Sequence, residues 1–324
     1  RISREEVVEL YDRVASFDVD LSFFETVTLM TFEHFSRKRV DFAVTETGMG
    51  GASDATNILQ PELSIITNVS QEHTDWLGET EEEIARRLAG VVKEEVPVVS
   101  GAGGRAGEVI EEAAEVRGAE FHSVSDSPEV LDTGSFELHL EIEGEEVDTG
   151  LVGSYQPDNV ATALEALGTM DREVSPRSVR RALENVSLEG RMEPVSREPL
   201  VLLDGAHNPA AVERLPETLE RLDGERTIVV TSIMEDKDYE RMLETIESFA
   251  DLVILSEAEK ERAAPAEKLE ASLGPVETVV RREVHDAVGA ALSYASEEDT
   301  VLFTGSLYFV GDVKRVLEEN RFSS

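Results

Sequence analysis

From residue 200 onward, short apolar runs alternate with stretches of helical periodicity, and no other feature constrains the fold as strongly. The runs lie at residues 200–203, 227–231, 252–255, 276–280 and 301–303, and the helical stretches at residues 210–222, 239–249, 265–273, 287–294 and 307–320. Short apolar runs bounded by turns are typical of buried parallel strands, which need helices on both faces. We therefore predict a doubly wound, Rossmann-like α/β domain in this half.

The first half shows a similar alternation. Ser3 and Glu6 predict a capping box at the start of the first helix. The remaining expected elements are helices at residues 24–37, 157–169 and 176–186, strands at 40–44, 63–67 and 96–99, and a hairpin within 136–152 that turns at 143–145. Residues 119–124 make a poor strand by composition. Because 324 residues exceed what one core usually serves, we predict two domains, 1–190 and 191–324, with the boundary in the polar stretch 188–199.

Composition excludes several classes of function. The formal net charge of −39 repels nucleic acid and anionic lipid, so we expect neither as a partner. With no cysteine, any metal must bind oxygen or imidazole ligands, which favours Mg²⁺. No segment is typical of a membrane span or a secretion signal, so we expect a soluble, cytoplasmic protein, and a monomer. Only six of the 30 basic residues are lysine, which suits a protein of a salt-accumulating, halophilic cytoplasm.

A glycine-rich segment directly follows the predicted strand at residues 40–44. It reads Glu-Thr-Gly-Met-Gly-Gly at 46–51 and continues through Ala-Ser-Asp-Ala-Thr-Asn at 52–57. Glycines at the carboxyl end of a strand let the backbone approach a ligand. A tight surface turn with helix-capping residues explains the same pattern, and the segment alone does not decide between the two.

A single histidine, His73, lies just beyond the next predicted strand. A lone histidine is more often structural than functional. Here it follows a strand that we expect to neighbour the one carrying Glu46. A carboxylate and an imidazole from neighbouring strand ends could share one cation.

In the second half, the first strand is followed by Asp-Gly-Ala-His-Asn-Pro at residues 204–209. Asn208 or Asp204 could simply cap a helix that has Pro209 in its first turn. The position after the first strand of the domain favours the other interpretation, in which Asp204 and His207 face a ligand. The charged run at residues 235–238, after the next strand, is open to either interpretation.

A second glycine-rich turn, at residues 101–106, resembles the dinucleotide fingerprint G-x-G-x-x-A. The acid expected at the end of the next strand is at best Asp126, and the intervening segment is the poor strand already noted. Nicotinamide binding, and with it an oxidoreductase function, is therefore an alternative that the pattern supports only weakly.

Taken in order, these segments resemble one family, the folylpolyglutamate synthase/dihydrofolate synthases of the Mur ligase superfamily. The motifs that carry the resemblance are the glycine segment at 46–57, Glu-His-Thr-Asp-Trp-Leu-Gly at 72–78, Ala-Gly-Val-Val-Lys at 89–93, Tyr-Gln-x-x-Asn at 155–159, Gly-Arg-Met-Glu at 190–193, the 204–209 segment, Asp-Lys-Asp at 236–238 and Gly-Ser-Leu-Tyr at 305–308. The resemblance spans nearly the whole chain. It implies a P-loop-type Mur ligase central domain, truncated at its N-terminus, followed by a Rossmann-like C-terminal domain.

The resemblance also implies a reaction, its cofactors and its site residues. ATP phosphorylates a carboxylate of dihydropteroate or a reduced folate, and the amino group of L-glutamate then displaces phosphate to form an amide. The implied site consists of the Mg²⁺ ligands Glu46 and His73, the pterin-contacting residues Ser53, Asp54 and Ala55, the ATP-holding residues Asn159, Arg191 and Asp204, and the candidate catalytic residues His207, with no role assigned, and Lys237.

Some positions depart from the pattern of the family. Ala52 replaces an arginine, Tyr155 a histidine and Glu72 an aspartate, and Leu88 stands where the family has a carbamylated lysine that serves a second metal. No G-x-x-x-x-G-K-[ST] loop occurs in the 324 residues. We therefore expect a truncated chain that is inactive without that loop. A non-catalytic relic of such a ligase is the second alternative.

Overall fold

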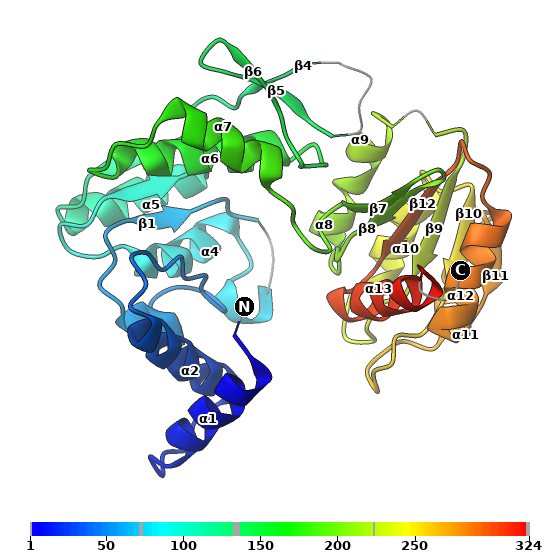
Figure 1. Cartoon of the computed structure of the whole chain (residues 1–324), viewed down its shortest axis with the longest axis horizontal. Helices are drawn as coiled ribbons and strands as arrows, with labels where there is room; N and C mark the ends of the chain where they lie inside the picture. The colour runs from blue at the N-terminus through cyan, green and yellow to red at the C-terminus, as the bar shows by residue number, and fades with distance from the viewer. Residues whose placement is uncertain (1, 71–73, 132–136, 223, 322–324) are drawn as a thin grey trace. The chain divides into compact units, whose positions relative to one another are not determined.

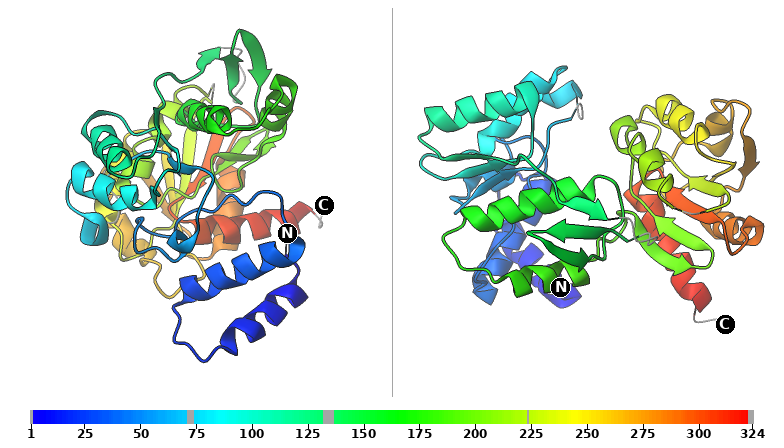
Figure 2. Two further views of the ribbon diagram at one scale, coloured as in Figure 1. Left: turned by 90° about the vertical axis from the view of Figure 1, so that its left-hand side faces the viewer. Right: turned by 90° about the horizontal axis from the view of Figure 1, so that it is seen from above.

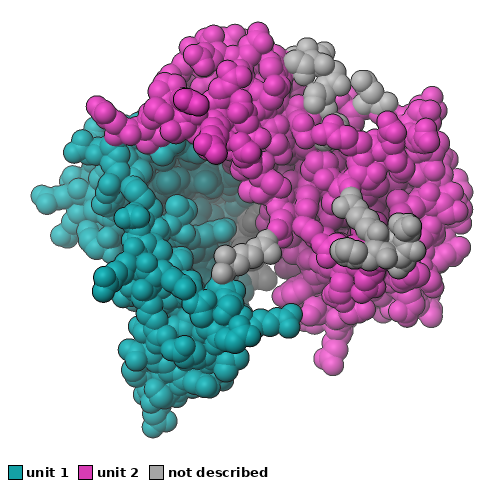
Figure 3. Space-filling view, viewed as in Figure 1, with its two compact units in different colours: residues 1–125, 162–172 teal, residues 126–161, 173–324 magenta. Residues whose placement is uncertain are grey.

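The computed structural model describes residues 2–70, 74–131, 137–222 and 224–321 and divides the chain into two compact units. Unit 1 comprises Arg1–Ser125 and Thr162–Arg172, and unit 2 comprises Asp126–Ala161 and Glu173–Ser324 (Figures 1 and 3). Among the described helices, none is long and apolar enough to cross a membrane. The predicted boundary near residue 190 stays a prediction, because these units are drawn by contacts rather than by chain order.

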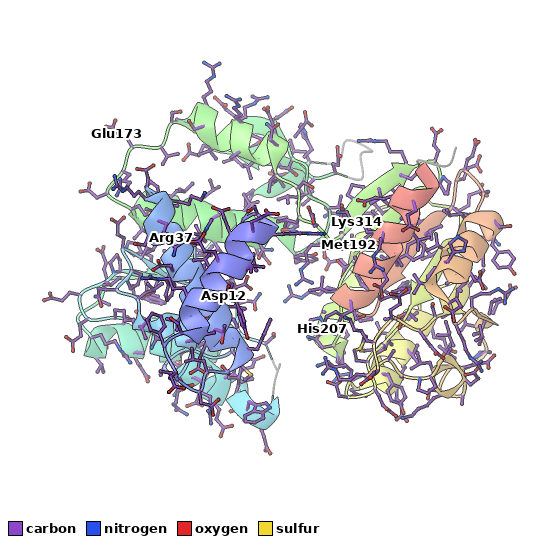
Figure 4. The ribbon with its side chains drawn as sticks, turned by 60° about the horizontal axis from the view of Figure 1, so that its bottom comes forward. Asp12, Arg37, Glu173, Met192, His207 and Lys314 are labelled. Atoms are coloured by element: carbon purple, nitrogen blue, oxygen red, sulfur yellow. The ribbon has the colours of Figure 1, made fainter. Side chains whose placement is uncertain are left out.

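Unit 1 joins a helical hairpin to a small parallel sheet. Its elements are α1 (Arg4–Ala15), α2 (Phe23–Lys38), α3 (Thr74–Leu77), α4 (Glu81–Leu88), α5 (Gly104–Val116), the short 3-10 helices η1 (Ala55–Ile58) and η2 (Ala89–Val91), and strands β1 (Ser64–Ile66), β2 (Val98–Ser100) and β3 (Phe121–Ser123). The predicted capping box of α1 is confirmed, since Ser3 and Glu6 each accept the other's backbone N–H. Ion pairs of Arg37 with Glu9 and of Glu33 with Arg13 tie α2 to α1 (Arg37 is labelled in Figure 4).

Two predictions in this unit were wrong. Residues 40–44 form no strand, because this segment pairs with no neighbouring backbone in the described structure, and Val44 is 95% exposed. Residues 121–123, within the segment judged a poor strand, do form one. They complete a parallel ladder with β2, and Phe121 packs against the core that β1, β2, α4 and α5 share. Tertiary pairing here outweighs local preference.

Unit 2 holds a small antiparallel sheet and a large, mainly parallel one. Its elements are β4 (Glu129–Leu131), β5 (His139–Ile142), β6 (Glu145–Asp148), α6 (Gln156–Thr169, whose second part belongs to unit 1), α7 (Pro176–Asn185), β7 (Glu193–Arg197), β8 (Leu200–Leu203), α8 (Pro209–Val212), α9 (Leu215–Leu219), β9 (Thr227–Thr231), α10 (Tyr239–Glu247), β10 (Leu252–Leu255), α11 (Ala266–Glu270), β11 (Glu277–Val280), α12 (Val284–Tyr294), β12 (Thr300–Thr304) and α13 (Leu307–Arg321). The predicted hairpin is β5–β6, with β4 as an additional strand. It lies beside α7 (Figure 2).

The large sheet has the order β11-β10-β9-β12-β8-β7, with β7 antiparallel to β8 and the other strands parallel. Successive strand residues face opposite cores: Leu202 packs with α8–α11, whereas Val201 and Leu203 pack with α12 and α13. The predicted doubly wound domain is therefore confirmed. The single helix predicted over 210–222 is two helices, because Pro216 has no N–H to continue the ladder.

Candidate functional site

The glycine-rich loop of unit 1 is organised around one carboxylate. Oδ2 of Asp54 accepts the backbone N–H of Gly48 at 2.8 Å and that of Met49 at 2.9 Å. Oδ1 accepts the N–H of Thr56 at 2.9 Å and its hydroxyl at 2.6 Å. Burial would raise the pKa of Asp54, but these hydrogen bonds outweigh it and lower the pKa. Asp54 therefore holds the loop in shape, while its neighbour Ser53 is exposed and Ala55 begins η1.

Close packing explains two glycines of this region. A β-carbon at Gly51 would lie 2.5 Å from the carbonyl oxygen of Arg87 and 2.7 Å from that of Leu88. A β-carbon at Gly90 would overlap the backbone of Ala52. The loop thus lies against the end of α4, and it places the half-buried Leu88, in the position of the expected carbamylated lysine, beside the glycine turn.

Glu46 is the carboxylate of this loop that stays unpaired. Its side chain is exposed, and within the described part of the chain it makes no hydrogen bond or ion pair. A free carboxylate oxygen suits a hard divalent cation, so Glu46 fits a metal ligand. The other predicted ligand, His73, lies outside the described residues, and across the described ranges no three acidic or histidine side chains gather into a metal site.

In unit 2, the carboxyl edge of the large sheet offers the position at which α/β domains bind ligands. The connections that follow β8 and β9 lead to helices on one face, whereas the connection after β12, which lies between them, leads to α13 on the other face. Such a reversal opens a crevice outside the strand ends. The predicted site residues Asp204, His207 and Lys237 all follow β8 or β9 at this edge.

Asp204 is almost completely buried at this edge, with 4% of its surface exposed. Its carboxylate accepts the N–H of Met192 and the N–H of Ala206, both at 2.8 Å. Burial raises the pKa of Asp204, against the effect of these bonds and of Arg191 and His207. The acid predicted to hold ATP therefore also joins the strand end to the segment that precedes β7.

The predicted nucleotide residue Arg191 is exposed and forms no ion pair within the described part of the chain. Its guanidinium lies over Gly205, where it would touch an added β-carbon. Tyr155 lies in the same cluster: burial, followed by the charge of Asp204, raises the pKa of Tyr155 to about 12, against the effect of Arg191 and Arg214. Asn159 lies one helical turn after Tyr155 and donates from Nδ2 to the buried Gln156 at 3.0 Å.

The two candidate catalytic residues differ in how firmly they are held. Nδ1 of His207 lies 2.9 Å from the carbonyl oxygen of Gly205 (His207 is labelled in Figure 4). A carbonyl can only accept, so Nδ1 carries the hydrogen, and in a neutral ring Nε2 is left as an acceptor. Lys237 is partly exposed, and its Nζ lies 3.4 Å from Asp236.

Sequence reasoning missed a pair of hydroxyls at the same edge. Thr231 and Thr304 end β9 and β12 opposite one another, are fully buried, and have hydroxyl groups with no hydrogen-bond partner among the described residues. Next to them, Gly305 has a φ of +112° and donates its N–H to Ala206 at 3.0 Å. Two threonines at adjacent strand ends were the only signal in the sequence, and that signal needs the strand order to be seen.

The second glycine-rich turn has a structural explanation. A β-carbon at Gly101 would overlap the carbonyl oxygen of Thr67, so the glycine allows β1 and the turn after β2 to pack together. The dinucleotide interpretation is therefore not needed to explain Gly101.

Comparison with known proteins covers both units. Residues 20–167 match the Mur ligase middle domain, and residues 190–307 match the Mur ligase glutamate ligase domain. The Bacillus subtilis "Dihydrofolate synthase/folylpolyglutamate synthase" is 34% identical over 91% of this chain and 72% of its own length. The Haloferax volcanii "Probable bifunctional folylpolyglutamate synthase/dihydropteroate synthase" is 35% identical over 91% of this chain but only 36% of its own length.

Solved structures agree with these sequence matches. The structure of E. coli FolC in complex with DHPP and ADP aligns with a TM-score of 0.88 and 30% identity, covering 99% of this chain and 77% of that one. A bifunctional folylpolyglutamate synthase/dihydrofolate synthase with Mn, AMPPNP and L-glutamate bound aligns with a TM-score of 0.83 and 28% identity, covering 98% of this chain and 77% of that one.

Proposed function

Because the chain belongs to the dihydrofolate synthase/folylpolyglutamate synthase family of Mur ligases, ATP-dependent amide-forming enzymes, we propose that it extends dihydropteroate, a reduced folate, or both with L-glutamate. The proposed reaction has two steps. A carboxylate oxygen of the acceptor attacks the γ-phosphorus of ATP, which forms an acyl phosphate and releases ADP. The amino nitrogen of glutamate then attacks the acyl carbon, a C–N bond forms, and phosphate leaves with the C–O bond pair.

The observation that carries the proposal is the unpaired Arg191 beside Asp204 at the carboxyl edge of the large sheet. A guanidinium that no carboxylate of the described chain neutralises is suited to phosphate oxygens. On a chain with a net charge of −39, an unpaired cation at a ligand-binding edge supports an anionic substrate.

The remaining residues fit the two proposed steps. Mg²⁺, when bound, would neutralise phosphate charge, and Glu46 is the carboxylate that would hold it, with His73 as the second ligand implied by the family. Nε2 of His207, when its ring is neutral, is suited to accept a proton from the glutamate ammonium. Lys237 would counter the negative charge of the glutamate carboxylates. Ser53 and Ala55 lie at the loop shaped by Asp54, where we place the pterin.

The test is glutamate-dependent ADP release by the complete natural protein, measured in parallel with dihydropteroate and tetrahydrofolate. Release that needs both glutamate and one of these acceptors supports the proposal. Titration of Mg-ATP into the same protein separates the alternatives, because a non-catalytic relic should bind the nucleotide weakly or not at all. Binding of NAD without binding of ATP would instead favour an oxidoreductase.

A further inference from the structure

A tight turn presents Arg191 to solvent. Gly190 has a φ of +66° and Met192 a φ of +48°, and the N–H of Arg191 donates to Leu188 at 3.3 Å. A positive φ is costly for a methionine, so the surrounding structure must stabilise this turn. Met192 is fully buried, which anchors one end of the turn in the core of the large sheet.

The side chain of Glu193 provides the second anchor. Its Oε2 accepts the N–H of Gly190 at 2.8 Å, and its Oε1 accepts Nζ of Lys314 at 2.7 Å. Lys314 lies on α13 and is labelled, like Met192, in Figure 4. One carboxylate thus joins the turn that carries Arg191 to a helix that follows it by more than a hundred residues.

Lys314 also reaches the acid on the other side of Arg191. Its Nζ lies 3.7 Å from Glu189, so it engages both carboxylates that flank Arg191 at two residues' distance. Burial alone would lower the pKa of Lys314, but Glu193 and Glu189 outweigh it and raise the pKa, so this lysine stays charged. Without that charge, the carboxylates of Glu189 and Glu193, each two residues from Arg191 in the chain, would lose the cation that they share.

We propose that Lys314 is a positioning residue that occupies Glu189 and Glu193 and thereby keeps Arg191 unpaired and directed toward the phosphates of the nucleotide. The inference rests on the proposed function, because it assumes that Arg191 binds a nucleotide. Lys314 itself does not touch the substrate. It acts by removing two competitors for the arginine and by fixing the turn through Glu193.

The experiment compares Lys314→Met with wild type in the complete natural protein, using calorimetric titration of ADP and steady-state kinetics. We expect the Kd for ADP and the KM for ATP to rise about tenfold, as expected for the loss of one oriented charge contact, with kcat at saturating ATP nearly unchanged. Lys314→Arg should retain the affinity. Arg315→Met is the matched control, since Arg315 lies on the same helix and pairs with Asp312 and Glu259 away from the turn.

A second substitution that restores ADP affinity would distinguish competition by the acids for Arg191 from a simple loss of structure in Lys314→Met. Glu189→Gln added to Lys314→Met removes one competing acid and should restore at least part of the ADP affinity, whereas a merely structural lysine would not be rescued. If Lys314→Met loses its cooperative melting transition, Lys314→Gln replaces it. If wild type binds nucleotide and Lys314→Met binds it equally well, the positioning role of Lys314 is overturned and the proposed function still stands. Wild type that binds no nucleotide overturns the proposed function and, with it, this inference.

Discussion

The backbone N–H of Met192 donates a 2.8 Å hydrogen bond to Oδ2 of Asp204, so the residue that follows β8 also holds the turn that precedes β7. The other oxygen of the same carboxylate accepts the N–H of Ala206. Asp204 therefore stabilises the local backbone and is also the residue of this domain that we predict to bind the nucleotide.

Asp204→Ala should weaken nucleotide binding more than folate binding. The change leaves two buried N–H groups unpaired, at a cost of about 1–3 kcal/mol each, and it loosens the turn that carries Arg191. Titrations of ADP and of dihydropteroate measure the two affinities separately. An unchanged affinity for ADP in a folded variant would show that this acid does not serve the nucleotide.

Glu46→Gln should abolish turnover and leave the free energy of unfolding nearly unchanged. Glu46 is exposed and has no partner among the described residues, so the substitution removes the charge that we propose to bind the metal without removing packing. ADP release and urea unfolding give the two readouts. Glu184→Gln, which affects an exposed ion pair with Arg180 on α7, is the control. Near-normal turnover by Glu46→Gln would refute the magnesium assignment.

Gly51→Ala should destabilise unit 1 by roughly 1–3 kcal/mol, because the new methyl group would press on the carbonyl oxygens of Arg87 and Leu88. Urea unfolding measures the loss. Gly168→Ala makes the matched comparison: this glycine lies in α6 with open space around its β-position, and the same change there should stabilise by about 0.5–1 kcal/mol. Equal effects at the two sites would contradict the packing explanation.

The β5–β6 hairpin should lose stability as the pH rises above neutrality. Nδ1 of His139 lies 2.6 Å from Asp148 and Nε2 lies 3.4 Å from Glu146, and these carboxylates raise the pKa of His139. A raised folded pKa gives stability that is fully present below the unfolded pKa, near 6.5, and is lost as the pH rises through the folded value. The stability difference between wild type and His139→Gln, from urea midpoints at pH 6 and pH 9, should shrink at the higher pH. A difference that is the same at both pH values argues against a charged His139.

Much of the fold could be predicted, because the four central strands of the large sheet, β8, β9, β10 and β12, are buried on both faces and are therefore mostly apolar. Strand β7 could not be predicted, since it is a partly exposed, antiparallel edge strand with an irregular register around Pro194. The opposite error was made at residues 40–44, where a strand was predicted and none forms. Their composition suits a strand, but no neighbouring backbone of the described chain is present for them to pair with. Local sequence cannot reveal which backbone is close by.

For the candidate site, the positions of some residues could be predicted from the sequence, but their hydrogen-bond partners could not. The positions of Asp204 and His207 followed from the strand that precedes them. Their partners did not, because the bond from Met192 to Asp204 and the bond from Lys314 to Glu193 join segments that are distant in sequence. The resemblance to the family placed Asp54 on a pterin-contacting loop, and the structure adds that its carboxylate is occupied in shaping that loop.

The excess of acidic residues predicts that stability depends on salt. The chain carries 69 acidic and 30 basic residues, and many of its arginines already form ion pairs, so the surplus of carboxylates repel one another. The screening length falls from about 10 Å at 0.1 M salt to about 3 Å at 1 M, which removes most repulsion between neighbouring surface charges. The free energy of unfolding should therefore rise between 0.1 M and 2 M KCl, and urea titrations at each concentration measure it.

A charge-reduced variant tests whether that repulsion is the cause. Four exposed acids are suitable for replacement by glutamine, because their side chains make no hydrogen bond or ion pair within the described structure: Glu111, Glu115, Glu240 and Glu244. The variant should be more stable than wild type at 0.1 M KCl and should gain less from added salt, because fewer like charges remain to be screened. Because the replaced side chains make no ion pair within the described structure, the substitutions remove negative charge without removing a salt bridge. A variant with the same salt dependence as wild type would assign the effect of KCl to hydration or ion binding rather than to the surplus of carboxylates.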